Sequence, residues 1–566
     1  MTDTTANTAG DRAVAIPRWG AATRDQDKAD ALPAVRWLAI AATGLLSGIV
    51  AALLMVLLMA AARTWLGISP PPEALPDRFA PTIPIPTFFS LFERFGGYNG
   101  LKRFGITSGL AGLFAVGAIV GITYALIVES RRSRGAGSWR NGFSRLGVGF
   151  VTVAALALWV ASAIVLWPVL DANYRGLPPG SARVASVLGL LVQYAAYGAA
   201  LVLLYRWLAP HPDLVMRPVP AGETLGRRAV VAGAAGVALA AGSGALIRDL
   251  NARATFSYDG LAYSGPGIQP IAPNDKFYTV TKNVVDPNVD AGLWRLEIGG
   301  LVEEPRSYSF EDLMNLGGVE QESTLMCISN RIGAGLFSNA VWQGIPLRDL
   351  LEASRPLPGA VEVLLNGADA YTDTFAFEKA MNPTTLVAFA MNGEPLPLRH
   401  GYPARVVVPG LYGEKNVKWV TRIEVVDHDA KGFYEQQGWG PNFVIPTRSD
   451  IFAPRWVRRR GDNFVEPFAA GQMATIRGRA FAGDRGIGRV EFSPDDGETW
   501  RDVRIDYPGT NLTWTFWSAD WLPEEPGEYT LVSRAVDGAG DPQPSESRGI
   551  VPQGATGYHR VVATVV

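Results

Sequence analysis

The sequence predicts a multidomain protein with an N-terminal all-α transmembrane bundle, an α+β domain and a C-terminal immunoglobulin-like β-sandwich. Three observations support this prediction. Apolar residues make up 48% of the chain and charged residues only 18%, which is unusual for a wholly soluble protein. The long apolar stretches all lie within residues 1–250. Beyond them, short strand patterns first alternate with short helix patterns and then occur alone.

The apolar half contains five stretches that are long enough to cross a bilayer as helices, which takes about 20 residues. These spans are expected at about Val35–Ala62, Ile106–Val128, Val148–Leu170, Val184–Leu208 and Ala229–Leu246. We expect residues 1–34 to be a disordered cytoplasmic N-terminus and residues 35–250 to form the transmembrane domain.

Arginines predict the orientation of the spans, because short cytoplasmic loops carry the excess of positive charge. The loop from Arg131 to Arg145 holds five arginines, whereas the loop after the third span holds only Arg175 and Arg183. The chain is therefore expected to be a multi-pass cell-membrane protein with its N-terminus inside. The Pro-rich segment after the first span, and everything after the fifth, are expected outside. Arg227 and Arg228 before the fifth span fit either a retained twin-arginine export signal or ordinary flanking charge.

The second half of the chain is expected to form two domains, at 251–450 and 451–566. In the first, strands are predicted for LWRLEIGGLV, AVEVLLNG, ARVVVPG and WVTRIEVVD. Short helices are predicted for SFEDLMNL and PLRDLLEAS. In the second, QMATIRGRAF, GRVEFS, TWTFWS and EYTLVSRAV predict strands only. Asp496 and Gly497 predict a hairpin turn between two of them. This pattern is typical of a β-sandwich.

Cys327, in STLMCISNRIG, is the only cysteine of the 566 residues. A disulfide within the chain is therefore impossible, since a bridge needs two cysteines. Two interpretations remain: a small buried apolar residue, which is common for a lone cysteine, or a thiolate that binds a soft metal.

Several motifs resemble the sulfite oxidase family of molybdopterin oxidoreductases. They are PNDKFYTVTKNVVDP, TLMCISNR followed by WQGIPLRDLL, and HGYPARVVVPGLYGEKNVKWV. The sandwich, with GRAFAGDRGIGRVEFSPDDGETW and RAVDGAGDPQP, resembles the dimerisation domain of the same family. The resemblance runs from Pro273 to the C-terminus. It implies a molybdopterin-binding oxidoreductase domain at 251–450 and a homodimer formed through 451–566.

The resemblance also implies which residues bind the molybdopterin cofactor. Cys327 matches the cysteine that binds molybdenum, and Arg331 matches an arginine of the oxyanion pocket. The pterin and its phosphate are expected to contact Asp275, Tyr278, Thr279, His400, Arg405, Asn416, Val417 and Lys418, with Thr374 as a looser match. A structural salt bridge is the alternative for Arg331, and ordinary surface charge is the alternative for Arg405 and Lys418.

One departure bears on the substrate. The family carries an active-site tyrosine in an Asp-Tyr-Lys-Gly-Phe run, whereas this chain reads DAKGF with Ala430 in that place; Tyr434 follows four residues later. A substrate less charged than sulfite, of the S- or N-oxide type, is therefore expected. A resemblance to the catalytic subunit of bacterial periplasmic methionine-sulfoxide reductases implies the same. Sulfite oxidation is the alternative.

The remaining composition limits the partners. A net charge of −2 gives no basic field for nucleic acid. None of the four histidines lies in a predicted span, so haem with two histidine ligands is not expected there. The spans are expected to anchor the enzyme or to dock a separate membrane or soluble redox partner. A transporter, or a receptor with an inactive oxidoreductase-like domain, is the alternative of another class; the spans lack the central acids or lysines that transport would favour.

Overall fold

The computed structural model describes residues 22–132, 145–209, 227–454, 456–459, 462–465 and 467–566. The chain divides into two compact units. The first comprises Met1–Leu54, Phe114–Ala155 and Ala196–Val237, and the second comprises Met55–Leu113, Leu156–Ala195 and Ala238–Val566. The predictions for residues 1–21, Arg134, Arg140 and His211 lie outside the described residues.

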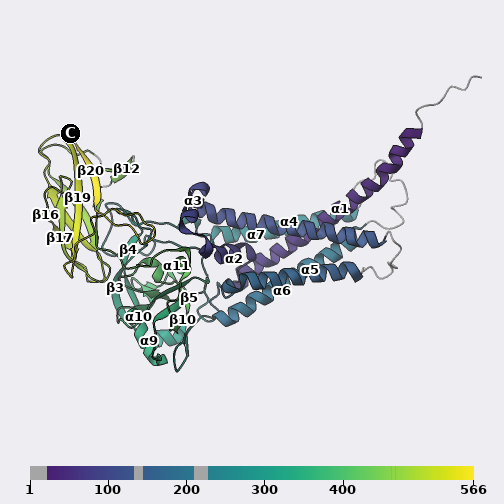
Figure 1. The fold of residues 1–566 in the computed structure, drawn as a ribbon, viewed down its shortest axis with the longest axis horizontal. Coiled ribbons are helices and arrows are strands. Elements are labelled where there is room, and N and C mark those ends of the chain that lie inside the picture. Colours follow the sequence, from purple (N-terminus) through teal and green to yellow (C-terminus); the bar gives the residue numbers. More distant parts are fainter. Residues whose placement is uncertain (1–21, 133–144, 210–226, 455, 460–461, 466) are drawn as a thin grey trace, which may run out of the picture. The chain divides into compact units, whose positions relative to one another are not determined.

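Among the described residues, five helices are long and apolar enough to cross a membrane (Figure 1). They are α1 (Ala22–Ala61), α4 (Tyr98–Arg132), α5 (Arg145–Leu166), α6 (Pro179–Leu208) and α7 (Arg227–Ala252). Each covers most or all of one predicted span; the third predicted span runs past the end of α5 at Leu166 into a short 3₁₀ helix, Trp167–Val169. The predicted disorder of residues 1–34 is wrong from Ala22 onward, because α1 begins there and its helical backbone runs without interruption into the apolar stretch.

Within the first unit, α1 and α4 approach each other closely at glycines. A Cβ added to Gly48 would lie 2.4 Å from the backbone oxygen of Gly117, and one added to Gly121 would lie 2.4 Å from that of Gly44. Each helix thus carries a pair of glycines four residues apart. Such pairs let helix backbones pack together where lipid supplies no hydrophobic driving force.

The second unit holds short helices between the long ones. The Pro-rich segment after α1 is not a simple loop: prolines occupy the first turns of α2 and α3, where a missing N–H costs nothing. The short elements are η1 (Ala62–Leu66), α2 (Pro71–Phe79), η2 (Ala80–Thr82), α3 (Ile85–Phe95), η4 (Trp167–Val169) and η6 (Thr255–Ser257).

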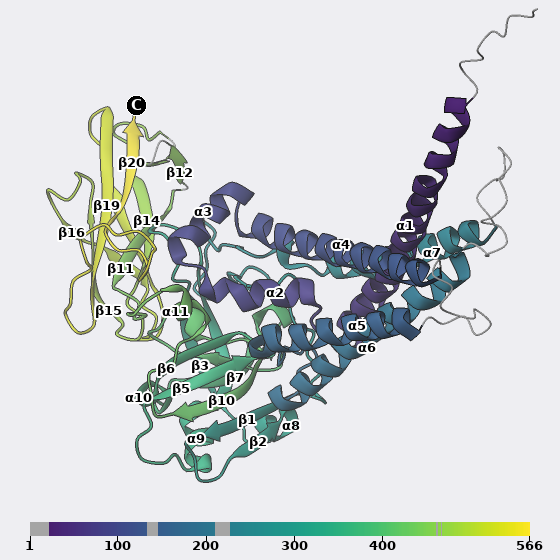
Figure 2. The ribbon, with the colours of Figure 1, turned by 45° about the vertical axis from the view of Figure 1, so that its right-hand side comes forward.

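Two five-stranded sheets form the α+β part of the second unit. Figure 2 shows the strands of one sheet side by side. In order they are β2 (Arg306–Ser309), β1 (Arg295–Gly300), β10 (Val420–Val426), β5 (Glu362–Gly367) and β6 (Thr372–Ala376). β1 pairs with β10 in parallel, and the other pairs are antiparallel. Burial alternates along β1, β5 and β10, as expected for strands with one face on a core.

The other sheet carries the segments that matter for function. It contains β3 (Val319–Met326), β4 (Phe337–Pro346), β7 (Leu386–Met391) and β8 (Glu394–Pro395), with β9 (Arg405–Val407) paired to β7. The helices of this region are α8 (Phe310–Asn315), α9 (Leu347–Ser354), α10 (Phe377–Ala380), η7 (Leu398–His400), η8 (Gly413–Lys415) and α11 (Phe433–Gln437). α8 begins where predicted because Ser309 and Asp312 form a capping box.

The C-terminal part consists of two sheets, as the strand-only pattern predicts. One has the order β11 (Arg448–Ala453), β14 (Ala474–Phe481), β18 (Thr515–Trp521) and β17 (Arg504–Tyr507). The other has the order β12 (Trp456–Arg459), β13 (Asp462–Val465), β20 (His559–Val565), β19 (Gly527–Asp537), β15 (Ile487–Ser493) and β16 (Arg501–Asp502). Ile476 and Trp517 from one sheet share a core with Phe492 and Val561 from the other. The sheets therefore form a sandwich, and Asp496 and Gly497, both at positive φ, lie in its predicted β15–β16 hairpin.

Candidate functional site

A cavity of about 440 Å³ lies within the second unit. Several parts of the chain line it, among them the segment between the first two long helices, residues 259–282, the loop after β3, the segment between β8 and β10, and the region of α11. Of the residues predicted for the site, the cavity brings together Tyr278, Thr279, Cys327, His400, Arg405, Asn416, Val417 and Lys418. Residues that are up to 140 positions apart in the sequence therefore share one lining.

Cys327 lies in the turn that follows β3. Its backbone N–H donates to the carbonyl of Leu336, and its Sγ lies 3.1 Å from the Oγ of Ser329. Burial, reinforced by the nearby carboxylate of Glu414, raises the pKa of the thiol to about 11. The thiol is therefore neutral near pH 7 in the chain alone, and a cation bound at sulfur would be needed to hold it as a thiolate.

Arg405 is a buried guanidinium that has no carboxylate partner. Its Nη1 donates to the carbonyl of His400 at 3.2 Å and its Nη2 donates to that of Asn416 at 3.1 Å, while its Nε has no partner among the described residues. Burial lowers the pKa of this group to about 10. Its guanidinium also lies over the ring of Trp342, with its Cζ 5.1 Å from the ring centroid. A buried cation that has no carboxylate partner among the described residues favours the binding of an anion.

Lys418 is in the same situation. Its Nζ donates to the carbonyl of Arg399 at 3.1 Å and to that of Val280 at 3.4 Å. Burial lowers the pKa of the ammonium group, although nearby acids oppose the change. Arg405 and Lys418 line the cavity together, so the alternative that they are ordinary surface charge is wrong.

The neutral residues shape the cavity. His400 is 2% exposed, and its Nε2 lies 2.9 Å from the carbonyl oxygen of Asn274. Burial lowers the pKa of His400 to about 3, so the ring is neutral at physiological pH. The Oδ1 of Asn416 accepts from the N–H of Val408, and its Nδ2 donates to the carbonyl of Tyr412. These bonds fix the loop that presents Val417 and Lys418.

Gly413 shows how closely this loop approaches the turn around Cys327. A Cβ at this position would lie 2.4 Å from the hydroxyl oxygen of Tyr278 and 3.6 Å from the Cα of Cys327. No side chain fits there, which explains the glycine of the GEKNVK motif.

Three predicted site residues lie elsewhere. Arg331 is exposed and does not line the cavity, because the chain turns outward after Asn330; its carbonyl accepts from Arg448 Nη2. Asp275 is also exposed and borders a separate pocket. Thr374 is buried in β6, outside the cavity lining. The geometry therefore does not support their assignment to the site.

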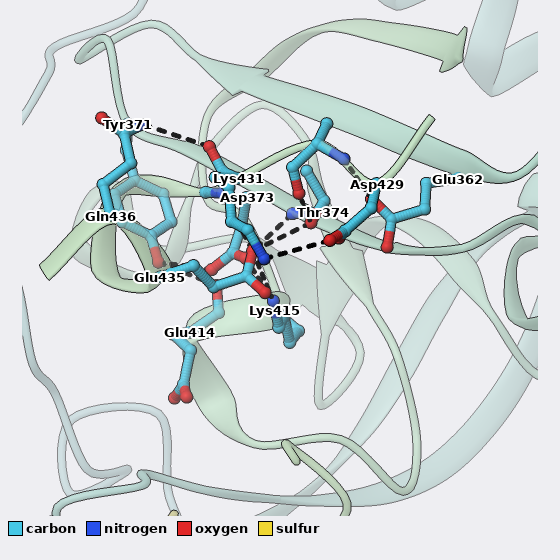
Figure 3. Close-up of polar contacts among 12 residues, drawn as sticks. Glu362, Tyr371, Asp373, Thr374, Glu414, Lys415, Asp429, Lys431, Glu435 and Gln436 are labelled. Carbon is cyan, nitrogen blue, oxygen red and sulfur yellow. Dashed lines mark hydrogen bonds and ion pairs between the residues drawn. The ribbon is translucent and has the colours of Figure 1, made fainter. Parts of the chain in front are cut away.

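Thr374 instead belongs to a polar network with Asp373, Lys415 and Glu435 (Figure 3). Its hydroxyl lies 3.1 Å from the carbonyl oxygen of Ala430 and 3.0 Å from the Oε2 of Glu435. Lys415 joins the network, with its Nζ 2.7 Å from Asp373 Oδ1 and 3.4 Å from Glu435 Oε2. Ala430 itself does not line the cavity, whereas Tyr434 does. Tyr434 therefore supplies the tyrosine of this loop to the cavity.

Glu414 is a cavity residue that sequence reasoning missed. Neither of its buried carboxylate oxygens has a well-formed hydrogen bond among the described residues. Burial, with Asp373 adding to it, raises the pKa of Glu414 to about 8; its own backbone N–H and the nearby Lys415 offset the rise only in part. Near neutral pH this group is largely a protonated acid. Its position inside GEKNVK is the signal that could have indicated it.

Two family models match the chain. Residues 283–434 match the oxidoreductase molybdopterin binding domain, and residues 451–565 match the Mo-co oxidoreductase dimerisation domain. The mitochondrial sulfite oxidase of Mus musculus is 30% identical over 344 residues, which cover 52% of this chain and 62% of that protein. The chain belongs to the sulfite oxidase family of molybdopterin oxidoreductases.

A further relative and a solved structure are also similar to this chain. The NAD(P)H nitrate reductase of Hordeum vulgare is 30% identical, over 46% of this chain and 35% of that protein. The solved structure of the sulfane dehydrogenase SoxCD from Paracoccus pantotrophus is 26% identical, over 53% of this chain and 85% of that chain, with a TM-score of 0.45. The chain spans less than two thirds of the length of the first curated relatives that it matches.

Family membership implies a molybdopterin cofactor, and the cavity fits one. A lone thiol beside the cavity is a soft ligand for a metal whose other sulfur ligands come from the pterin. The unpaired Arg405 and Lys418, with the orphaned Nε of Arg405, match an anionic phosphate. Cys327 would thus hold the metal, and Arg405 and Lys418 would hold the phosphate end of the cofactor.

Proposed function

We propose that this chain is a membrane-anchored molybdopterin oxidoreductase that transfers an oxygen atom to or from a small S- or N-oxide substrate outside the cytoplasm. The observation that carries the proposal is the shared cavity, in which Cys327 lies together with the unpaired cations Arg405 and Lys418. When bound, the cofactor supplies the two-electron chemistry of oxygen-atom transfer.

The residues of the chain bind, orient and supply protons. Arg405 and Lys418 fix the anionic end of the cofactor, and neutral His400 braces the loop of Asn274 against the cavity. Glu414 holds a proton at its carboxyl group near neutral pH. Reduction of an S-oxide to a sulfide and water consumes two protons, so a protonated acid at the cavity suits that direction.

Glu414 also bears on the choice of substrate. Its protonated carboxyl group can donate to the oxygen of an uncharged S- or N-oxide, and above about pH 8 its carboxylate form would repel the doubly charged sulfite ion. Arg405 and Lys418 are engaged by the cofactor in this proposal, and Lys282, a further cation at the cavity, is paired with Asp77. Arg399, whose Nη2 donates to the carbonyl of Asn274, is then the remaining cation of the lining that could attract sulfite, whereas a sulfoxide needs none.

Steady-state assays of molybdenum-loaded protein test this assignment. The protein should reduce sulfoxides with a reduced dye as electron donor and should oxidise sulfite poorly with an artificial acceptor. Efficient sulfite oxidation without sulfoxide reduction would establish the alternative activity, that of a sulfite oxidase. An Ala430→Tyr variant provides a second comparison: we expect no gain in sulfite oxidation, because the backbone of Ala430 is tied into the polar network away from the cavity.

The proposed topology has the N-terminus inside, five spans and the remainder of the chain outside. Contacts within the second unit support it: Lys102 at the start of α4 pairs with Asp259, and Arg175 between α5 and α6 pairs with Asp290. The connections after the first and third spans thus contact the domain that follows the fifth, as an up-and-down order requires. A reporter active only in the cytoplasm should stay silent when fused after Val566.

The four predicted segments, 1–34, 35–250, 251–450 and 451–566, remain our proposed domain division, with residues 22–34 now assigned to a helix. The match to a dimerisation domain supports a homodimer through the C-terminal sandwich, which we propose is immunoglobulin-like. Electrons would come from a separate redox partner. Sedimentation of the purified chain in detergent should give the mass of a dimer.

A further inference from the structure

One wall of the cavity comes from outside the residues that match the family models. It is an aromatic wall made of Phe88, Phe89, Phe92 and Tyr98, which lie in α3 and at the start of α4. Their rings pack together, with centroids 4.5 Å apart for Phe88 and Phe92 and 5.1 Å apart for Phe92 and Tyr98. The matched molybdopterin domain begins only at residue 283. This wall is therefore an addition to the family domain.

Buried contacts hold the aromatic wall in place. Lys102, one turn beyond Tyr98, donates from Nζ to Asp259 Oδ2 and to the carbonyl of Thr281, each at 2.7 Å. The side chain of Ile85 is 4% exposed and belongs to the same core as Met326, which precedes Cys327. The wall is thus built into the second unit, with polar anchors on one side and core packing on the other.

Trp439 faces the same space from the loop after α11. Its ring lies 6.1 Å from that of Phe89 in an edge-on arrangement, and the cavity lining includes both. The side chain is 7% exposed, yet its indole N–H has no acceptor among the described residues. Buried tryptophan N–H groups normally donate a hydrogen bond, and a buried N–H group without an acceptor costs free energy. An oxygen atom of a ligand in the cavity would satisfy it.

The helix that precedes Trp439, α11, is anchored to the segment between α1 and α4 as well. The Nε2 of Gln437 donates to the carbonyl of Ala80 at 2.8 Å. Tyr434, which lies in α11, lines the cavity together with Tyr98. Aromatic residues from two distant parts of the sequence therefore line one region of the cavity, and the indole N–H of Trp439 there has no partner among the described residues.

We propose that the aromatic wall and Trp439 form a substrate subsite that selects an uncharged S- or N-oxide with an apolar, preferably aromatic, substituent. The rings take the substituent, and the indole N–H donates to an oxygen of the substrate. This inference rests on the proposed function, because it names the substrate class of that site. It also assigns a role to the segment between the first two spans beyond connecting them.

The test compares two sulfoxides with the full-length, molybdenum-loaded protein. Methyl phenyl sulfoxide carries a ring for the wall, whereas dimethyl sulfoxide does not. The Phe89→Ala variant should raise KM for methyl phenyl sulfoxide by about ten- to a hundredfold, since burial of a Phe-sized surface is lost. KM for dimethyl sulfoxide should change by less than about threefold, because little apolar surface is involved.

Phe95→Ala is the matched control. Phe95 lies in the same helix, but its ring stacks on Phe104 at 4.4 Å and does not line the cavity. This variant should leave the KM values of both sulfoxides unchanged. Equal effects of Phe89→Ala and Phe95→Ala would overturn the subsite, since they would indicate a general change in α3.

Binding without turnover gives a second measurement. Calorimetric titration with methyl phenyl sulfone, which is not reduced, should show binding that Phe89→Ala weakens and that Trp439→Phe weakens by about two- to tenfold through loss of one hydrogen bond. Molybdenum content and melting temperature should match the wild type in each variant. If Phe89→Ala does not load molybdenum, the Phe89→Leu and Trp439→Phe variants are compared with the wild type in the same KM and binding measurements.

The outcomes separate the two proposals. If the wild type binds the sulfone with the predicted variant effects but reduces no sulfoxide, the proposed activity fails and the subsite stands. If the wild type reduces both sulfoxides and the wall variants change neither KM, the subsite fails and the activity stands. Binding of a short-chain quinone in place of the sulfone would also overturn the assignment of the wall to substrate.

Discussion

Two lysines three residues apart in GEKNVK have opposite surroundings. Lys415 is buried against carboxylates, with Asp373 at 2.7 Å and Glu435 at 3.4 Å (Figure 3). Lys418 contacts carbonyl oxygens and the ring of Trp419, forms no ion pair among the described residues, and lines the cavity. Burial opposes the charge of both, but Asp373 and Glu435 outweigh it at Lys415 and raise its pKa, whereas burial prevails at Lys418 and lowers its pKa. The paired lysine holds the fold, and the unpaired one is available to bind an anion.

The largest effect is expected on the cavity side, at Cys327. Cys327→Ser should lower kcat by more than about a hundredfold. Loss of a residue that only supports a metal ligand costs up to about a hundredfold, and loss of the ligand itself should cost more. Pterin should remain bound, because Arg405 and Lys418 are unchanged. Assays and pterin analysis of the same preparation measure both, and near wild-type turnover would contradict the ligand role.

Replacing the paired lysine should damage the fold. Lys415→Met removes the partner of Asp373, whose side chain is only 2% exposed, and should lower the free energy of unfolding by about 3–5 kcal/mol. Denaturant unfolding in detergent measures the change. Protein that does fold should still contain pterin; loss of pterin without loss of stability would reverse the roles that we assign to the two lysines.

Replacing the unpaired cations should reduce pterin binding and leave the stability of the fold intact, the opposite of what is expected for Lys415→Met. Lys418→Met or Arg405→Met should reduce the pterin retained per folded chain by about ten- to a hundredfold, since each removes a charge-assisted bond. Stability of the cofactor-free chain should not fall, because an uncompensated buried charge has been removed. Arg422→Met, at a half-exposed pair with Glu297, is the control and should retain pterin.

Acid should destabilise the cofactor-free chain through two buried histidines. Burial lowers the pKa of His400 to about 3 and that of His559 to about 4, from an ordinary value of 6.5. The unfolded chain therefore binds more protons below pH 6.5, so the free energy of unfolding falls as pH drops from 6.5 toward 4. His559→Gln should flatten this slope in melting curves; an unchanged slope would exclude His559 as a source.

The smallest effect is expected at an exposed pair. Arg560 and Asp496 are 51% and 58% exposed, so Arg560→Met should cost less than about 1 kcal/mol in the same unfolding experiment. If Arg560→Met lowered the free energy of unfolding as much as Lys415→Met, an exposed ion pair would stabilise the fold as much as a buried one. Burial would then not explain why Lys415 matters for stability.

Motifs predicted much of the fold and part of the site. Strands such as β5 and β10 follow the alternation of their residues, and Cys327, Arg405 and Lys418 meet where the motifs imply. Spacing could not show that Arg331 turns outward or that Thr374 bonds to Glu435, because both depend on where the backbone goes after a turn.

The aromatic wall could not be predicted from the sequence for a different reason. Phe88 and Phe89 look like ordinary apolar residues in a Pro-rich connection, and their significance comes from Trp439, which is 350 positions away from Phe89. Without an alignment, nothing in the sequence links the two segments. Glu414 is similar: its unpaired carboxyl group becomes visible only when the lining of the cavity is known.

The most direct test of the central claim is the molybdenum and pterin content of the purified full-length protein. We expect molybdenum and pterin in equal amounts in the wild type, pterin kept and molybdenum reduced in Cys327→Ser, and pterin lost in Lys418→Met but kept in Lys415→Met. A folded wild-type protein, made in cells that supply the cofactor, that contains no pterin would contradict it.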